Sequence, residues 1–182
     1  MRLFTALDLP PAVVDSVDEL LRRLRPTARV RWSPAENLHI TIKFIGEFPE
    51  ARIAELNQAL AGVPRRAAIP VKIRGVGFFP NARNPNSFWC GVESPEMETL
   101  AADVNRAVSA LIVSRETGFT PHLTLARSRK RGDMTRLREV SAELPSLEFG
   151  EFEAQSFFLY LSKPTSGGSV YTKLAEFPLL PT

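Results

Sequence analysis

Cysteine and histidine are both scarce in this chain of 182 residues. A single cysteine, Cys90, excludes an intramolecular disulfide and any zinc site built on several cysteines. One free thiol is typical of a reducing compartment, so we expect a cytoplasmic protein. Two histidines, His39 and His122, are available for acid–base chemistry near neutral pH.

Long apolar runs and a strong net charge are also missing. No stretch approaches the roughly 20 apolar residues that a transmembrane helix needs, and the first residues lack the apolar core of a signal peptide. We therefore expect no membrane partner. Lysine and arginine total 23 against 20 acidic residues, and the pI of about 9.3 favours an anionic partner only mildly.

Hydrophobic spacing predicts alternating helices and strands. Apolar residues three and four positions apart indicate helices at 10–26, 49–60, 96–113 and 133–144. Strands are expected at 2–9, 29–32, 38–45, 69–79, 87–92, 121–127, 152–161 and 170–177. This order, with mainly antiparallel strands, predicts an α+β fold. No linker rich in glycine, serine or charge divides the chain, so we expect residues 1–182 to form one domain.

The two histidines occur in matching local sequences. His39 and Thr41 are separated by one aliphatic residue, and so are His122 and Thr124. The histidines are 83 residues apart, close to half the chain, which indicates an internal duplication into two lobes. Because side chains alternate along a strand, each histidine shares a face with its threonine. Two lobes that face each other would bring both pairs into one cleft.

Such a cleft suits phosphoryl chemistry. One imidazole can accept a proton from an attacking water while the other donates a proton to the leaving oxygen. Each threonine hydroxyl can donate a hydrogen bond to a non-bridging phosphate oxygen. No metal or other cofactor is required. A structural role for both histidines is the competing interpretation, but their shared context favours catalysis. The strand argument does not decide which histidine is the acid.

Flanking residues give the chain a family resemblance. The paired motifs resemble the signature of the 2H phosphoesterase superfamily. The wider pattern resembles bacterial and archaeal RNA 2′,3′-cyclic phosphodiesterases, historically called 2′-5′ RNA ligases. It is carried by segments 2–10 (RLFTALDLP), 31–47 (RWSPAENLHITIKFIGE), 79–85, 119–127 (FTPHLTLAR) and 170–172. The resemblance implies a bilobal fold in which two pseudo-symmetric, mainly antiparallel sheets face a central cleft, with helices on the outer faces.

The resemblance also implies a reaction and the roles of its residues. RNA that ends in a 2′,3′-cyclic phosphate would be hydrolysed to a 2′-phosphomonoester without a metal ion. His39 would donate a proton to the leaving 3′ oxygen, and His122 would accept a proton from water. Thr41 and Thr124 complete the expected catalytic set.

Five further residues are candidates for substrate binding. Arg127 could clamp a phosphate, although strict alternation places it on the face opposite its own motif unless a bulge re-aims it. Lys43 is expected on the face of the first motif, where it would add positive potential. Arg83 could contact the substrate from its loop. Phe48 and Tyr171 could stack on a base of single-stranded RNA. For each of them the alternative is a packing or solvated surface role.

Three functions follow from these patterns. The first is hydrolysis of cyclic phosphate at RNA ends. The second is reversible joining of RNA ends through a 2′-5′ linkage by the same acid and base, as a side activity. The third is a non-catalytic cleft that binds RNA ends or phosphorylated nucleotides. We expect the protein to be a monomer.

Overall fold

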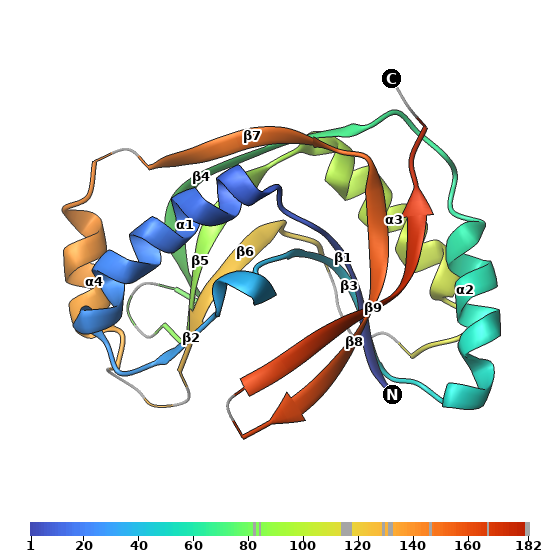
Figure 1. Cartoon of the computed structure of the whole chain (residues 1–182), viewed down its shortest axis with the longest axis horizontal. Helices are drawn as coiled ribbons and strands as arrows, with labels where there is room; N and C mark the ends of the chain where they lie inside the picture. Colours follow the sequence, from blue (N-terminus) through green and yellow to red (C-terminus); the bar gives the residue numbers. More distant parts are fainter. Residues whose placement is uncertain are drawn as a thin grey trace.

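The computed structural model describes residues 1–81, 83, 85–113, 118–128, 130, 133–145, 147–166 and 168–180. Within them, nine strands form one curled antiparallel sheet, and four α-helices pack against it (Figure 1). The strands are β1 (Arg2–Leu7), β2 (Arg31–Trp32), β3 (Ile40–Glu47), β4 (Ile69–Phe79), β5 (Ser87–Glu93), β6 (His122–Arg127), β7 (Glu148–Ala154), β8 (Ser156–Thr165) and β9 (Gly168–Pro178). The α-helices are α1 (Pro11–Leu24), α2 (Ile53–Ala61), α3 (Pro95–Val108) and α4 (Thr135–Ala142). The predicted α+β class is confirmed.

The strand order shows how the two lobes are joined. The order is β7-β4-β5-β6-β3-β1-β8-β9. The short strand β2 pairs with the end of β6, where Trp32 is opposite Ala126. At the centre, β3 and β6 are antiparallel, with Ile40 opposite Leu123. Counted outward from this junction, β3, β1 and β8 in one lobe correspond to β6, β5 and β4 in the other. The two expected sheets are therefore continuous through one narrow pairing.

Each lobe contains elements from both halves of the chain. The late strands β8 and β9 extend the sheet beyond β1, whereas the early strand β4 lies beside β5. The helices cross over in the same way, because α1 packs on β7 and α3 packs on β3 (Figure 1). Neither lobe is therefore a continuous piece of chain.

The helices bury one apolar stripe each against the sheet. Helix α1 begins with Pro11, whose missing N–H costs nothing in a first turn, and α3 begins with Pro95 for the same reason. The buried residues of α1 are three and four positions apart: Val13, Val17, Leu20, Leu21 and Leu24. They join the main core, which also contains Ile40 and Leu123. Among the described residues, no helix has both the length and the apolar character to cross a bilayer.

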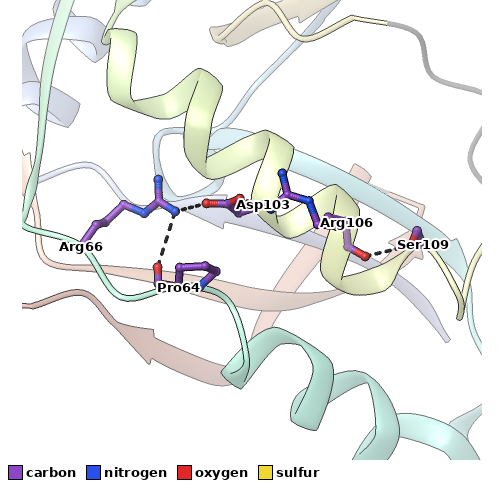
Figure 2. A network of polar contacts seen from close by, with 5 residues as sticks. All are labelled: Pro64, Arg66, Asp103, Arg106 and Ser109. Carbon is purple, nitrogen blue, oxygen red and sulfur yellow. Dashed lines mark hydrogen bonds and ion pairs between the residues drawn. The ribbon is translucent and has the colours of Figure 1, made fainter.

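A polar network anchors α3 and marks where it ends (Figure 2). Arg66, in the segment before β4, forms an ion pair with Asp103 on α3 and donates to the Pro64 carbonyl (3.5 Å). Asp103 also accepts from Arg106 (2.7 Å). The predicted helix 96–113 is too long, because the Ser109 hydroxyl donates to the Arg106 carbonyl (2.8 Å) and α3 ends at Val108. The single strand predicted at 152–161 is also wrong, because it divides at residue 155 into β7 and β8.

Candidate active site

The two motifs lie side by side at the junction of the lobes. Ile40 and Leu123 face each other there and are both 0% exposed, on the side of the sheet that the helices cover. Because successive side chains alternate, the histidine and threonine that flank each of them project from the opposite face. The first motif, His39 and Thr41, and the second motif, His122 and Thr124, thus share this face. We call it the cleft face.

Backbone carbonyls fix both imidazole rings. His39 Nδ1 lies 2.7 Å from the Asn37 carbonyl oxygen, and His122 Nδ1 lies 2.8 Å from the Thr120 carbonyl oxygen. A carbonyl oxygen can only accept, so Nδ1 carries the hydrogen in both rings. The Nε2 atom is then free to act as a base when the ring is neutral and as an acid when it is protonated. His39 Nε2 is also 3.1 Å from Thr41 Oγ1.

A β-bulge directly follows the threonine of each motif. Ile42 has no partner between the pairs Thr5–Lys43 and Ala6–Thr41, and Leu125 has none between Phe88–Ala126 and Trp89–Thr124. An extra residue of this kind breaks the strict alternation of side chains. The third residue after each threonine therefore returns to the cleft face. These residues are Phe44 and Arg127.

Contacts confirm both positions. Arg127 Nη2 lies 3.5 Å from Thr124 Oγ1, so the bulge brings this guanidinium to the second motif. Phe44 is opposite Phe4 on β1, and the ring of Phe4 lies 4.8 Å from that of His39. Phe44 is 46% exposed, which makes it a large apolar surface that is open to solvent on the cleft face. Sequence reasoning missed it.

The same bulge removes Lys43 from the site. Lys43 is 6% exposed and lies opposite Thr5, which is also buried. Paired residues share a face of the sheet, so Lys43 points to the side away from the motifs. The expectation that Lys43 lies beside His39 and Thr41 is wrong, because it assumed unbroken alternation.

Phe48 is not available for stacking either. It is 3% exposed, just beyond the end of β3. Its carbonyl accepts a hydrogen bond from the amino group of Met1 (2.7 Å), and the guanidinium of Arg52 lies 5.8 Å from its ring centre. The expectation of base stacking on Phe48 is wrong, because the turn after β3 packs this ring into the core.

Of the other two candidates, Tyr171 is half-buried and Arg83 is exposed. The ring of Tyr171, on β9, stands at 90° to the His39 ring with the centres 5.1 Å apart, so it belongs to the first motif's surroundings. Arg83 is exposed in the loop after β4, where its backbone N–H donates to Asn81 Oδ1 (3.0 Å). Residues 82 and 84 lie outside the described residues. Binding by Arg83 stays a prediction.

Aromatic rings form a wall beside the second motif. The ring of Phe79 stands edge-on to that of His122, with the centres 5.1 Å apart. The ring of Phe79 also lies against that of Trp89, with the centres 5.0 Å apart. Trp89 is opposite Thr124 and therefore on the cleft face. Its indole lies over Gly77, where a Cβ atom would be 2.2 Å from the ring. Sequence reasoning did not assign Phe79 or Trp89 to the site, although 79–85 is one of the segments that carry the resemblance.

Burial and charge lower the pKa of both imidazoles. Burial is the largest effect at each ring, and the hydrogen bond to the backbone carbonyl opposes it. The positive charge of Arg127 lowers the pKa of both histidines. The charge of His122 also lowers that of His39, which shows that the two rings influence each other. Asp8 raises the pKa of His39.

A cleft of about 470 Å³ opens beside His39. Its lining includes Asp8, Asn37, Tyr160, Tyr171 and Lys173. Within the described residues, no three side chains of histidine, cysteine, aspartate or glutamate are grouped so that they could share a metal ion.

Residues 7–89 match the LigT-like phosphoesterase family, and so do residues 91–171. Each matched segment contains one of the two motifs. The chain belongs to this family. Among curated relatives, the RNA 2′,3′-cyclic phosphodiesterase of Methanocaldococcus jannaschii is 30% identical over 97% of this chain and 100% of that protein. The protein of the same name from Archaeoglobus fulgidus is 33% identical, over 97% and 99%.

Solved structures of LigT-like proteins have the same fold. A protein of Thermus thermophilus superposes with a TM-score of 0.83 at 30% identity over 98% of both chains. Escherichia coli LigT in complex with 3′-AMP has a TM-score of 0.76 at 26% identity, over 98% of this chain and 96% of that one. The Escherichia coli protein has also been solved with ATP (TM-score 0.75, 25% identity). The bilobal α+β expectation is thus confirmed.

Proposed function

We propose that this protein hydrolyses the 2′,3′-cyclic phosphate at the end of an RNA chain to a 2′-phosphomonoester. The observation that carries the proposal is the placement of both motifs on adjacent antiparallel strands, with each Nδ1 held by a carbonyl. Relatives that match this chain over almost their whole length and are named RNA 2′,3′-cyclic phosphodiesterase support it.

The proposed reaction is an in-line displacement at phosphorus. His122 Nε2 accepts a proton as water attacks, and His39 Nε2 donates a proton to O3′ as the P–O3′ bond breaks. The products are a free 3′ hydroxyl and a phosphate on O2′. His122 is left protonated and His39 neutral, and proton exchange with water restores both.

The remaining groups of the site stabilise negative charge on the phosphate. Thr41 and Thr124 each have a hydroxyl on the cleft face, where they can donate to the two non-bridging oxygens. Arg127 lies beside Thr124 in the same region. Its positive charge stabilises the negative charge that develops on the phosphate during attack. We expect all three to act mainly on the chemical step.

The nucleotide next to the phosphate needs a surface for its base. Tyr171 and the exposed ring of Phe44 are the aromatic groups that we propose for stacking, as single-stranded RNA favours. The complexes of Escherichia coli LigT with 3′-AMP and ATP support free nucleotides as further ligands.

The experiment is incubation with an oligoribonucleotide that ends in a 2′,3′-cyclic phosphate, with a chelator present to test metal independence. We expect a 2′-phosphate as product. Release of a 3′-phosphate would contradict the assigned direction, and no turnover would contradict the proposal. His39→Ala and His122→Ala should each lower turnover about 10²–10⁴-fold. Glu139→Gln, an exposed change on α4, is the matched control.

The same acid and base also favour reversible joining of RNA ends through a 2′-5′ linkage as a side activity. In that reaction a 5′ hydroxyl replaces water as the nucleophile: His122 accepts its proton, His39 donates a proton to O3′ as the P–O3′ bond breaks, and a 2′-5′ linkage forms. We expect this product only at high RNA concentration, because water is the competing nucleophile. RNA binding without any turnover, unchanged in His39→Ala, would instead favour a non-catalytic cleft.

A further inference from the structure

The carboxylate of Asp8 is held by two strands next to the first motif. Asp8 directly follows β1, and its side chain is 35% exposed. It accepts a hydrogen bond from the Tyr160 hydroxyl on β8 and pairs with the ammonium group of Lys173 on β9. Lys173 is itself fixed over the ring of Phe158, 4.1 Å from its centre. Asp8 and Lys173 also line the cleft beside His39.

The register of β1 and β3 places Asp8 across from His39. Ala6 is opposite Thr41, and Leu7 is opposite Ile40. One more step along both chains brings Asp8 opposite His39 on the cleft face, because residues that face each other across antiparallel strands share a face.

The corresponding position of the second lobe carries no carboxylate. The residue opposite His122 is Gly91 on β5. A Cβ atom at Gly91 would lie 2.5 Å from the Arg74 carbonyl oxygen, so the fold has no room for a side chain there. At equivalent positions, therefore, a carboxylate lies beside His39, whereas a glycine without a side chain lies beside His122.

We propose that Asp8 is a positioning residue that acts through His39, favours the protonated form of that ring, and so gives the pseudo-symmetric site its direction. His39 is then the acid and His122 the base. This inference rests on the proposed function, and it supplies a physical reason for roles that the two similar motifs do not assign.

Several other groups face His39, and their effects differ in sign. Burial is the largest effect on the pKa of His39 and lowers it, as do the positive charges of Arg127 and His122. The hydrogen bond to the Asn37 carbonyl and the negative charge of Asp8 raise it. Burial and Asp8 raise the pKa of Tyr160, so its hydroxyl stays a donor to Asp8. The other polar groups around the cleft are Asp15 on α1, Glu36 in the turn before β3, and Tyr171 and Lys173 on β9. Lys173 partly neutralises Asp8, so its removal strengthens the effect of Asp8 on His39.

The chain offers a direct measurement, because it contains two histidines. Each gives one imidazole Hε1 signal, which His39→Ala and His122→Ala assign, and titration by NMR then follows both rings separately. In Asp8→Asn we expect the midpoint of His39 to fall by about 0.5 pH units or more, with that of His122 nearly unchanged. In Lys173→Met we expect the midpoint of His39 to rise.

The control is Asp15→Asn, a matched change at an exposed position of the same cleft, which should leave the His39 midpoint in place. Equal shifts of both histidines in Asp8→Asn, or no shift, would overturn the inference. If Asp8→Asn does not fold, the midpoint of His39 in Lys173→Met still decides the question. A rise supports the inference, and a fall or no change overturns it.

Activity gives a second readout that separates the two proposals. In Asp8→Asn the alkaline limb of the kcat/KM profile should move to lower pH in step with His39, because the acid form is lost earlier. An active variant whose profile and titration are unchanged overturns the inference alone. An inactive wild-type protein overturns the proposed function, and the titrations then still test the effect of Asp8 on His39.

Discussion

Replacing Gly77 with alanine tests how closely the wall beside the second motif is packed. A Cβ atom there would lie 2.2, 2.4 and 2.7 Å from three atoms of the six-membered ring of Trp89. Real Cβ atoms do not approach carbon so closely, so the indole must move. Overpacking of this kind costs about 1–3 kcal/mol. For a chain of this size, we expect the melting temperature to fall by about 2–12 °C.

The displacement should also reach the catalytic groups. Trp89 lies against Phe79, which stands edge-on to His122. Moving the indole removes the support of that ring, so we expect kcat to fall along with stability. Misplaced catalytic groups lose rate steeply, by up to about 10²-fold for a shift of 1 Å.

A double-mutant cycle separates this clash from a general defect of β4. Trp89→Phe removes the ring atoms that a Cβ at Gly77 would meet, so Gly77→Ala should cost much less in that background. Thermal unfolding and steady-state kinetics of the four proteins give the coupling between the two sites. Additive effects would refute the reasoning, because the cost would then arise from the backbone at residue 77 and not from contact with the indole.

Three further predictions follow from the site and from the network that anchors α3. Phe44→Ser should raise KM for RNA roughly 5- to 150-fold, the value of one stacked base, with little change in kcat, whereas Arg127→Gln should lower kcat about 10²–10³-fold. Steady-state kinetics with one cyclic-phosphate substrate compares the two variants. A fall in kcat for Phe44→Ser together with a rise in KM alone for Arg127→Gln would contradict both roles. Because the pKa values of His39 and His122 are both lowered, the optimum of kcat/KM should lie below about pH 6.5. Arg66 lowers the pKa of Asp103, so Asp103→Asn should cost about 1–3 kcal/mol near pH 7. A lowered carboxyl pKa stabilises the fold fully above its unfolded value and loses this effect as the pH falls through the folded value. Urea unfolding should therefore show the difference shrink progressively below about pH 4. A constant gap would exclude the ion pair as the cause.

The position of the proposed catalytic groups could be predicted from sequence because it depends on local rules. Alternation along a strand puts His39 with Thr41, and His122 with Thr124, whatever the strands pair with. The near half-chain spacing indicates the duplication, and both repeats match the family separately. These inferences required no knowledge of register.

The position of the binding groups could not be predicted, because it depends on pairing between distant segments. The bulge at Ile42 exists only in register with β1, whose Thr5 is 38 residues away from Lys43 in the chain. Alternation alone therefore placed Lys43 in the cleft, where the structure places Phe44. Arg127 shows the same effect with the opposite outcome, since the second bulge brings it into the site.

The two bulges also explain how one repeated motif places two different kinds of side chain on the cleft face. Phe44 and Arg127 each stand third after a motif threonine, and both reach the cleft face by the same local distortion. One is an exposed aromatic ring suited to a base, and the other is a cation suited to a phosphate. Asp8 and Gly91 form a second pair of equivalent positions with different chemistry, since one carries a carboxylate and the other has no side chain. A symmetric scaffold would bind the cyclic phosphate equally well in two orientations, and only one of these leads to a 2′-phosphate. In the proposed reaction, the differences at these two pairs of positions would therefore let a duplicated fold cleave one of two P–O bonds.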